Sequence, residues 1–202
     1  AHPPPPRWAL LKFASMIKPN IFRPHDEAPA RASFRSTGPF STDQAKGRTF
    51  QFVSRGDFVR GQLLLPETVE PRPAPLVLVT FDSGRAASLA EAEFAEEWVR
   101  LGFALAAIDL PLHGDRSSPK LSERLTKGAE ALMSGVTLDL DTRALVEEFA
   151  RQSTSDLVRA VEAIGALPEI DSHRIGLLGI GLGALTSAFA LPHAENLVVG
   201  VL

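Results

Sequence analysis

The amino-acid sequence predicts an α/β fold in which a mostly parallel sheet is opened by an antiparallel hairpin and carries helices on both faces. Short unbroken apolar runs, typical of strands buried on both faces, alternate with segments of helical periodicity. Before these runs, residues 48–54 alternate apolar and polar side chains, as a strand does. Arg55-Gly56-Asp57 then predicts a turn, and residues 58–65 are the second, returning strand of a hairpin. Alternating strands and helices favour a parallel sheet, and the return at the turn adds the hairpin.

The first strand–helix unit begins with the run LVLVTF after Pro75 and continues into the turn Asp82-Ser83-Gly84. Ser88 and Glu91 have the spacing of a capping box, which predicts that a helix begins there. We expect the buried face and the end of this helix to be formed by Phe94, Trp98, Leu101 and Gly102.

Two further units and the start of another strand follow the same pattern. Between them, residues 115–153 predict an irregular connection with a helix around 143–149, and this connection is a candidate lid. The expected elements are a strand at 103–110, a helix with Leu157, Val161 and Ile164 on one face that ends at Gly165 and Pro168, a strand at 174–180, a helix at 184–191, and a strand beginning at 196–202.

The chain of 202 residues, 45% of them hydrophobic, has the size of one domain. Residues 1–47 are rich in proline among polar side chains, which predicts an extended or irregular N-terminal arm. Residues 48–202 form the expected domain. Because the sequence begins with Ala1, removal of an export signal is compatible with it, so both a cytoplasmic and an exported soluble protein fit.

Composition argues against several classes of function. Lys and Arg number 21 against 24 Asp and Glu, so a net charge of -3 offers no basic excess for binding nucleic acid. There is no cysteine, and no two of the five histidines have zinc-ligand spacing, so we expect no metal site. No run of eighteen apolar residues is present, so we expect no membrane span.

The informative segment is Gly179-Ile180-Gly181-Leu182-Gly183, which directly follows one predicted strand and precedes a predicted helix. It resembles the nucleophile elbow of the α/β-hydrolase family, which reads Gly-x-Ser-x-Gly in this strand–turn–helix context. Gly179 and Gly183 match the flanking glycines of the elbow. Gly181 stands at the position of the nucleophilic serine and provides no oxygen that could attack a carbonyl.

Two other segments resemble landmarks of the same family, so the resemblance covers residues 48–202. Residues 108–116, IDLPLHGDR, resemble its Asp-x-Pro-x-His-Gly turn, where we expect His113 to satisfy local backbone groups. The loop at 81–84 corresponds to the family's oxyanion loop but has Phe-Asp in place of His-Gly. The resemblance implies that the oxyanion and pocket residues are Leu182, Ser83, Gly84 and Asp82.

The resemblance implies an esterase- or lipase-like lineage and a small ligand similar to an acyl ester. The family's acid and histidine follow the nucleophile on later strands, whereas this sequence stops at Leu202. We therefore expect the C-terminal strands and two further catalytic residues to be missing, and the protein to be inactive. An apolar edge strand at 196–202 also predicts that more chain or a protein partner lies against it.

Two alternatives remain open on the sequence. The first is a non-catalytic binding or interaction module on the same fold. The second rests on residues 179–184, which also fit the dinucleotide fingerprint G-x-G-x-x-G/A. That fingerprint needs an acidic residue at the end of the next strand, where the sequence reads LVVGVL. We therefore expect no cofactor.

Overall fold

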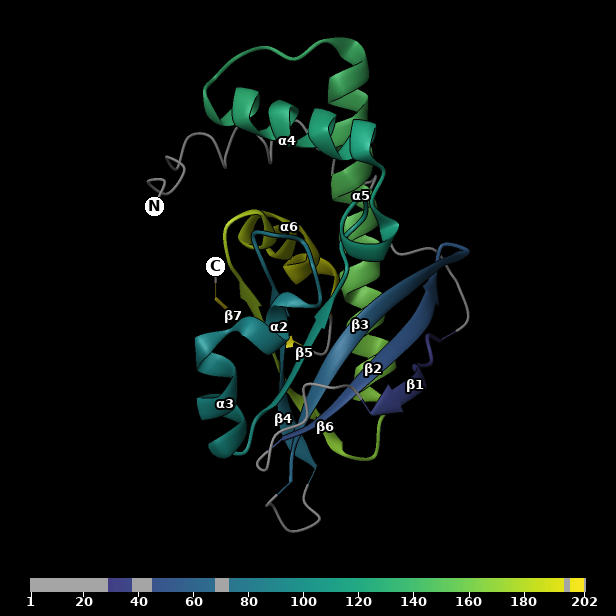
Figure 1. Ribbon diagram of the computed structural model, residues 1–202, viewed down its shortest axis with the longest axis vertical. Helices are drawn as coiled ribbons and strands as arrows, with labels where there is room; N and C mark the ends of the chain where they lie inside the picture. The colour runs from purple at the N-terminus through teal and green to yellow at the C-terminus, as the bar shows by residue number, and fades with distance from the viewer. Residues whose placement is uncertain (1–28, 38–44, 68–72, 195–196, 202) are drawn as a thin grey trace.

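The computed structural model describes residues 29–37, 45–67, 73–194 and 197–201 and shows one mixed sheet between layers of helices (Figure 1). The described residues form seven strands in the order β1-β2-β3-β5-β4-β6-β7. Their bounds are Ser33–Thr37 for β1, Ala45–Ser54 for β2, Asp57–Pro66 for β3, Ala74–Thr80 for β4, Ala104–Ile108 for β5, Ile170–Gly179 for β6 and Leu197–Val201 for β7.

The strand pairings confirm the predicted α/β class and the hairpin. Strands β4, β5, β6 and β7 are mutually parallel, while β1, β2, β3 and β5 pair antiparallel. The hairpin turns at Arg55 and Gly56, both with positive φ. Residues 33–37 and 45–47 are extended but pair into the sheet of the domain, so the predicted boundary of the arm at residue 47 is wrong there. Residues 29–32 belong to no helix or strand, and residues 1–28 and 38–44 lie outside the described residues.

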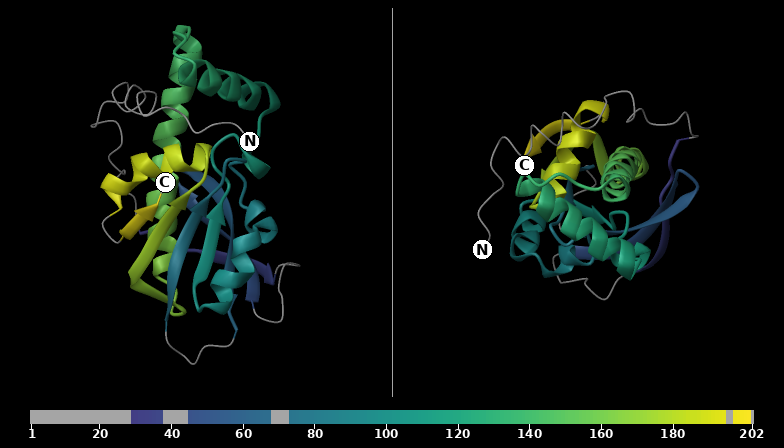
Figure 2. Two further views of the ribbon diagram at one scale, coloured as in Figure 1. Left: turned by 90° about the vertical axis from the view of Figure 1, so that its left-hand side faces the viewer. Right: turned by 90° about the horizontal axis from the view of Figure 1, so that it is seen from above.

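Helices cover both faces of the sheet (Figure 2). On one face α2 and α3 pack over Leu64, Val79 and Leu105. On the other face α5 packs over Leu63, Leu78 and Ala106, and α6 contacts both β4 and β6. The helices are Ser88–Glu91 for α2, Glu93–Arg100 for α3, Pro119–Met133 for α4, Leu140–Gly165 for α5 and Leu182–Ala190 for α6, with short 3₁₀ turns at Gly114–Arg116 and Leu191–His193.

Residues 115–153 are more regular than the sequence predicted. They contain α4 and the first half of α5, a single helix of 26 residues that continues from this connection into the domain. The carboxylate of Asp139 accepts a hydrogen bond from the Thr142 N–H and so caps α5. The α4–α5 arm, defined as residues 119–150, projects beyond the sheet in Figure 1. The predicted helix around 143–149 is therefore one part of a longer helix.

Two local predictions in the first strand–helix unit are wrong. Ser88 does not form a capping box, because its hydroxyl lies 2.7 Å from the hydroxyl of Ser83 and α2 has no side-chain cap. Leu101 is 66% exposed, whereas Phe94 and Trp98 pack half-buried against the core, as predicted, beside the buried Ala95 and Val99. The end of α3 beside Gly102, at φ 91°, agrees with the prediction.

Within the described residues, no helix combines the length and the apolar character that a membrane crossing needs.

Candidate functional site

The candidate site lies at the carboxyl ends of β4 and β6. From β4 the chain crosses to β5 on one side, whereas from β6 it crosses to β7 on the other side. In open α/β sheets, ligands bind in the crevice at such a reversal of strand order. Asp82 follows β4 and Gly181 follows β6, so these two residues lie at the reversal of strand order, which we call the crevice.

Gly181 joins β6 to α6 with φ 59° and ψ −121°, a backbone conformation that side-chain-bearing residues rarely adopt. The flanking glycines are required by close packing. A Cβ on Gly183 would overlap the carbonyl of Thr80, and a Cβ on Gly179 would overlap the backbone of Ala184. The same Thr80 carbonyl accepts a hydrogen bond of 2.9 Å from the Ile180 N–H, which joins the ends of β4 and β6.

Asp82 fills the space beside Gly181. Its Oδ1 atom accepts a hydrogen bond of 2.8 Å from the backbone N–H of Leu182, the first residue of α6. A Cβ placed on Gly181 would lie within 2.7 Å of three Asp82 side-chain atoms. The structure therefore brings together three of the predicted site residues, Asp82, Gly181 and Leu182.

Ser83 and Gly84 make local contacts within and beside the β4–α2 loop. The Gly84 N–H donates to the carbonyl of Phe81 at 3.0 Å, and a Cβ on Gly84 would overlap the ring of His113. The Ser83 hydroxyl accepts from the Arg85 N–H at 3.3 Å, in addition to its contact with Ser88. The oxyanion role implied for these two residues stays a prediction.

Asp109 was not singled out from the sequence, although it stands in the quoted segment IDLPLHGDR. Its buried carboxylate accepts hydrogen bonds from the Ala86 N–H at 2.8 Å and the Asp115 N–H at 3.2 Å. Gly114 has φ 53°, and a Cβ there would overlap the same carboxylate. Asp109 thus joins the β4–α2 loop to the β5–α4 loop. Its place as the acidic residue of the landmark was the available signal.

His113 has the local role that the sequence predicted. Its Nδ1 lies 2.8 Å from the carbonyl of Pro111, and its ring packs against Phe149 with centroids 5.8 Å apart. The hydrogen bond orients the ring within its own loop, and Phe149 brings that loop against α5.

Arg116 connects the β5–α4 loop to α5 and to the hairpin. Its guanidinium donates to Asp156 at 2.6 Å and to Asp57 at 3.0 Å. Burial raises the pKa of the Asp156 carboxyl above its ordinary value, and the nearby Arg116 charge opposes that rise. Burial is the larger of the two effects.

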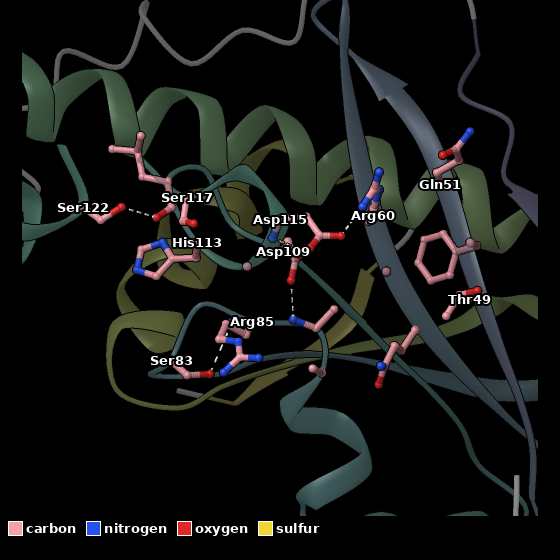
Figure 3. Close-up of a pocket in the computed structure, with 17 residues that line it drawn as sticks. Thr49, Gln51, Arg60, Ser83, Arg85, Asp109, His113, Asp115, Ser117 and Ser122 are labelled. Carbon is pink, nitrogen blue, oxygen red and sulfur yellow. Dashed lines mark hydrogen bonds and ion pairs between the residues drawn. The ribbon is translucent and has the colours of Figure 1, made fainter. Parts of the chain in front are cut away.

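A pocket of about 660 Å³ lies beside the crevice and is visible in Figure 3. Its walls come from β2, β3 and the loops that Asp109 joins. The Gln62 Oε1 atom is buried and has no hydrogen-bond partner among the described residues. Ser83 reaches the pocket, whereas neither Gly181 nor Leu182 lines it. The polar lining residues are Thr49, Gln51, Arg60, Gln62, Ser83, Arg85, Asp109, His113, Asp115, Ser117 and Ser122.

Within the part of the chain that the structure describes, no cluster of three or more His, Asp or Glu side chains could hold a metal ion. The two hydroxyl-bearing residues of α6 both have hydrogen-bond partners. Thr186 donates to the Gly183 carbonyl at 3.0 Å, and the Ser187 hydroxyl lies 2.7 Å from that of Thr80.

Comparison with known proteins identifies the fold through structure alone. No protein-family model and no curated protein matches the sequence. A Bacteroides fragilis protein assigned to the acetyl xylan esterases matches with a TM-score of 0.66 and 16% identity, covering 96% of this chain and 52% of that one. Acetyl xylan esterase 1 from Thermoanaerobacterium matches with a TM-score of 0.59 and 17% identity, covering 96% and 57%.

A dienelactone hydrolase-like promiscuous phosphotriesterase from metagenomic libraries matches with a TM-score of 0.54 and 21% identity, covering 78% of this chain and 58% of that one. This chain therefore spans between half and two thirds of the length of these structures. At identities of this size the likeness shows the fold and nothing finer. The sheet order, the helices on both faces and these structural neighbours together give the chain an α/β-hydrolase-type fold.

Proposed function

We propose that this chain is an α/β-hydrolase-type domain of esterase lineage that performs no serine-dependent ester hydrolysis at residue 181. The observation that carries the proposal is Gly181 itself. Its φ and ψ are those of a sharp strand-to-helix turn, as a nucleophile elbow requires, but the residue has no side chain. Covalent catalysis at this position needs a side-chain nucleophile, so acyl transfer to residue 181 is chemically impossible.

The electrostatics of the crevice support the same proposal. Stabilisation of an oxyanion depends on preorganised donors aimed at the developing negative charge. The Leu182 N–H, the donor that would follow a nucleophile at 181, points at the Asp82 carboxylate. A second negative charge would be repelled there. The same repulsion disfavours a dinucleotide, whose pyrophosphate would have to bind at the N-terminus of α6.

The proposal is tested by turnover of short esters such as p-nitrophenyl acetate and butyrate. We expect hydrolysis by the purified chain to stay at the rate of buffer alone, because no nucleophile is present at 181. Gly181→Ser alone should also leave the chain inactive, since the Cβ of the added side chain would overlap Asp82. Saturable turnover by the unsubstituted chain would overturn the proposal.

A second candidate function, ligand binding without turnover, is favoured by the pocket beside the crevice. The volume of about 660 Å³ is within the range of small-molecule sites. A buried acceptor without a partner carries an energetic cost that a ligand hydroxyl could remove, and Gln62 Oε1 is such an atom. Because two structural neighbours are acetyl xylan esterases, acetylated xylo-oligosaccharides are the first ligands to test.

Titration calorimetry with acetylated xylo-oligosaccharides tests this second candidate. We expect binding to the unsubstituted chain and a loss of at least tenfold in affinity in Gln62→Met, which removes the amide at similar size. Gln152→Met is the matched control, because Gln152 bonds to Glu148 on α5 and does not line the pocket. Absence of binding, or equal loss in both variants, would contradict the assignment.

A further inference from the structure

Asp82 makes two contacts in the crevice, one with Gly181 and one with Leu182. Its carboxylate fills the space into which a side chain at residue 181 would point, and it accepts the backbone N–H of Leu182. The first three amides of α6 divide between different acceptors. Those of Gly183 and Ala184 donate to the carbonyls of Ile180 and Gly181, both at 3.0 Å. The Leu182 amide donates to the Asp82 carboxylate instead.

This position stabilises a carboxylate. The N–H groups of the first helical turn have no partner within the helix, and the helix dipole favours a negative charge there. A hydrogen bond to an ionised acceptor is also stronger than one between neutral groups. Any acyl oxygen that approached the Leu182 amide would therefore have to displace a covalently tethered anion. A tethered group competes without the entropic cost of association.

We propose that Asp82 is a built-in anion that occupies the oxyanion position at the Leu182 amide and that only a glycine at 181 can accommodate. Residues 82 and 181 thus form one structural unit. A side chain at 181 pushes the carboxylate away from Leu182, and removal of the carboxylate makes room for a side chain at 181. The steric half of this inference stands on the structure alone. The functional half rests on the proposed function, because the Leu182 amide is an oxyanion donor only if the turn is an elbow.

A double-mutant cycle in urea unfolding tests the steric half. The variants are Gly181→Ala, Asp82→Ala and their combination. Gly181→Ala should raise the unfolding equilibrium constant by about tenfold more in the presence of Asp82 than in Asp82→Ala, because only the chain that keeps Asp82 has a hydrogen bond to Leu182 left to lose. The strain of positive φ contributes equally in both backgrounds and cancels.

Gly56→Ala is the matched control for this cycle. Gly56 also has positive φ, 80°, but a Cβ there would meet no heavy atom within 4 Å. Its cost should be the same with and without the Asp82 side chain. Equal costs of Gly181→Ala in the two backgrounds would overturn the inference.

Amide hydrogen exchange gives a second readout that does not need a side chain at 181. We expect Asp82→Ala to speed exchange of the Leu182 N–H at least tenfold relative to the Gly183 and Ala184 amides, whose acceptors are backbone carbonyls. Unchanged exchange at Leu182 in a folded Asp82→Ala would overturn the inference. Ester turnover by the unsubstituted chain would refute the proposed function and leave both of these results intact, so the two failures are distinguishable.

Discussion

The buried carboxylate of Asp109 offers the sharpest prediction about what holds the candidate site together. Asp109 is 7% exposed and accepts hydrogen bonds from Ala86 and Asp115, one in each loop that lines the pocket. Asp109→Ala leaves both N–H groups without this acceptor. An unpaired buried donor costs about 1–3 kcal/mol, and the half-exposed Asp115 N–H about 1 kcal/mol, so the expected loss of stability is about 2–4 kcal/mol.

Urea unfolding at pH 7 measures this loss as a shift in midpoint at an unchanged denaturant slope. Asp109→Asn should lose less, about 1–2 kcal/mol, because one carbonyl oxygen remains to accept from Ala86. Asp115→Ala is the matched control from the same loop. Its carboxylate pairs with Arg60 at the surface, where such pairs contribute about 0–1 kcal/mol. A loss below about 1 kcal/mol in Asp109→Ala would refute the argument that this carboxylate joins the two loops.

Three further predictions concern the surrounding fold. Because burial raises the pKa of Asp156 in the folded state, the stabilisation by this group is complete below its unfolded pKa and is lost as pH rises through the folded pKa. Between pH 7 and pH 4, the unfolding free energy of the unsubstituted chain should therefore increase relative to that of Asp156→Asn. A difference that does not depend on pH would contradict this. Hydrogen bonds from Thr142 lower the pKa of Asp139 to about 2, so the stabilisation of the start of α5 by Asp139 should be complete above its unfolded pKa of about 3.9 and be lost as pH falls toward 2. The Thr142 amide should then lose protection from hydrogen exchange in the unsubstituted chain, whereas its protection in Asp139→Asn should not change with pH. Gly61→Ala places a Cβ against the Phe50 ring and the Ala107 carbonyl, so it should lower the free energy of unfolding in urea by about 1–3 kcal/mol. An unchanged unfolding midpoint would show that the strands separate to accept the Cβ without strain.

Local patterns in the sequence predicted the fold class well because strands and helices have distinct periods. The apolar run LVLVTF became β4, and the alternation on either side of Arg55-Gly56-Asp57 became the β2–β3 hairpin. The prediction was incomplete at residues 115–153, where it included a helix around 143–149 but neither α4 nor the full length of α5. The buried face of this half of α5, formed by Val146, Phe149 and Ala150, packs with residues of α4 and of the β5–α4 loop rather than on the sheet.

The candidate site was predicted in part for a related reason. The glycines at 179, 181 and 183 mark a backbone requirement that is local in sequence, so the turn could be recognised. The contact between Asp82 and Leu182 joins residues 100 positions apart, and the role of Asp109 depends on the loops it connects. No period or motif spacing encodes such contacts. Asp82 was selected from its place after β4, but its carboxylate could not be placed beside Gly181 without the sheet order.

The most direct test of the proposal that residue 181 keeps an elbow backbone without a nucleophile is labelling with a fluorophosphonate, which forms a stable adduct with activated serine hydroxyls. Intact-mass and peptide mass spectrometry would be applied to the unsubstituted chain after incubation with the reagent. We predict no adduct on any serine, because residue 181 is glycine and the nearby Ser187 hydroxyl is buried against Thr80. A stoichiometric adduct on Ser83, Ser187 or another serine would contradict the account, because it would reveal an activated nucleophile elsewhere in the fold.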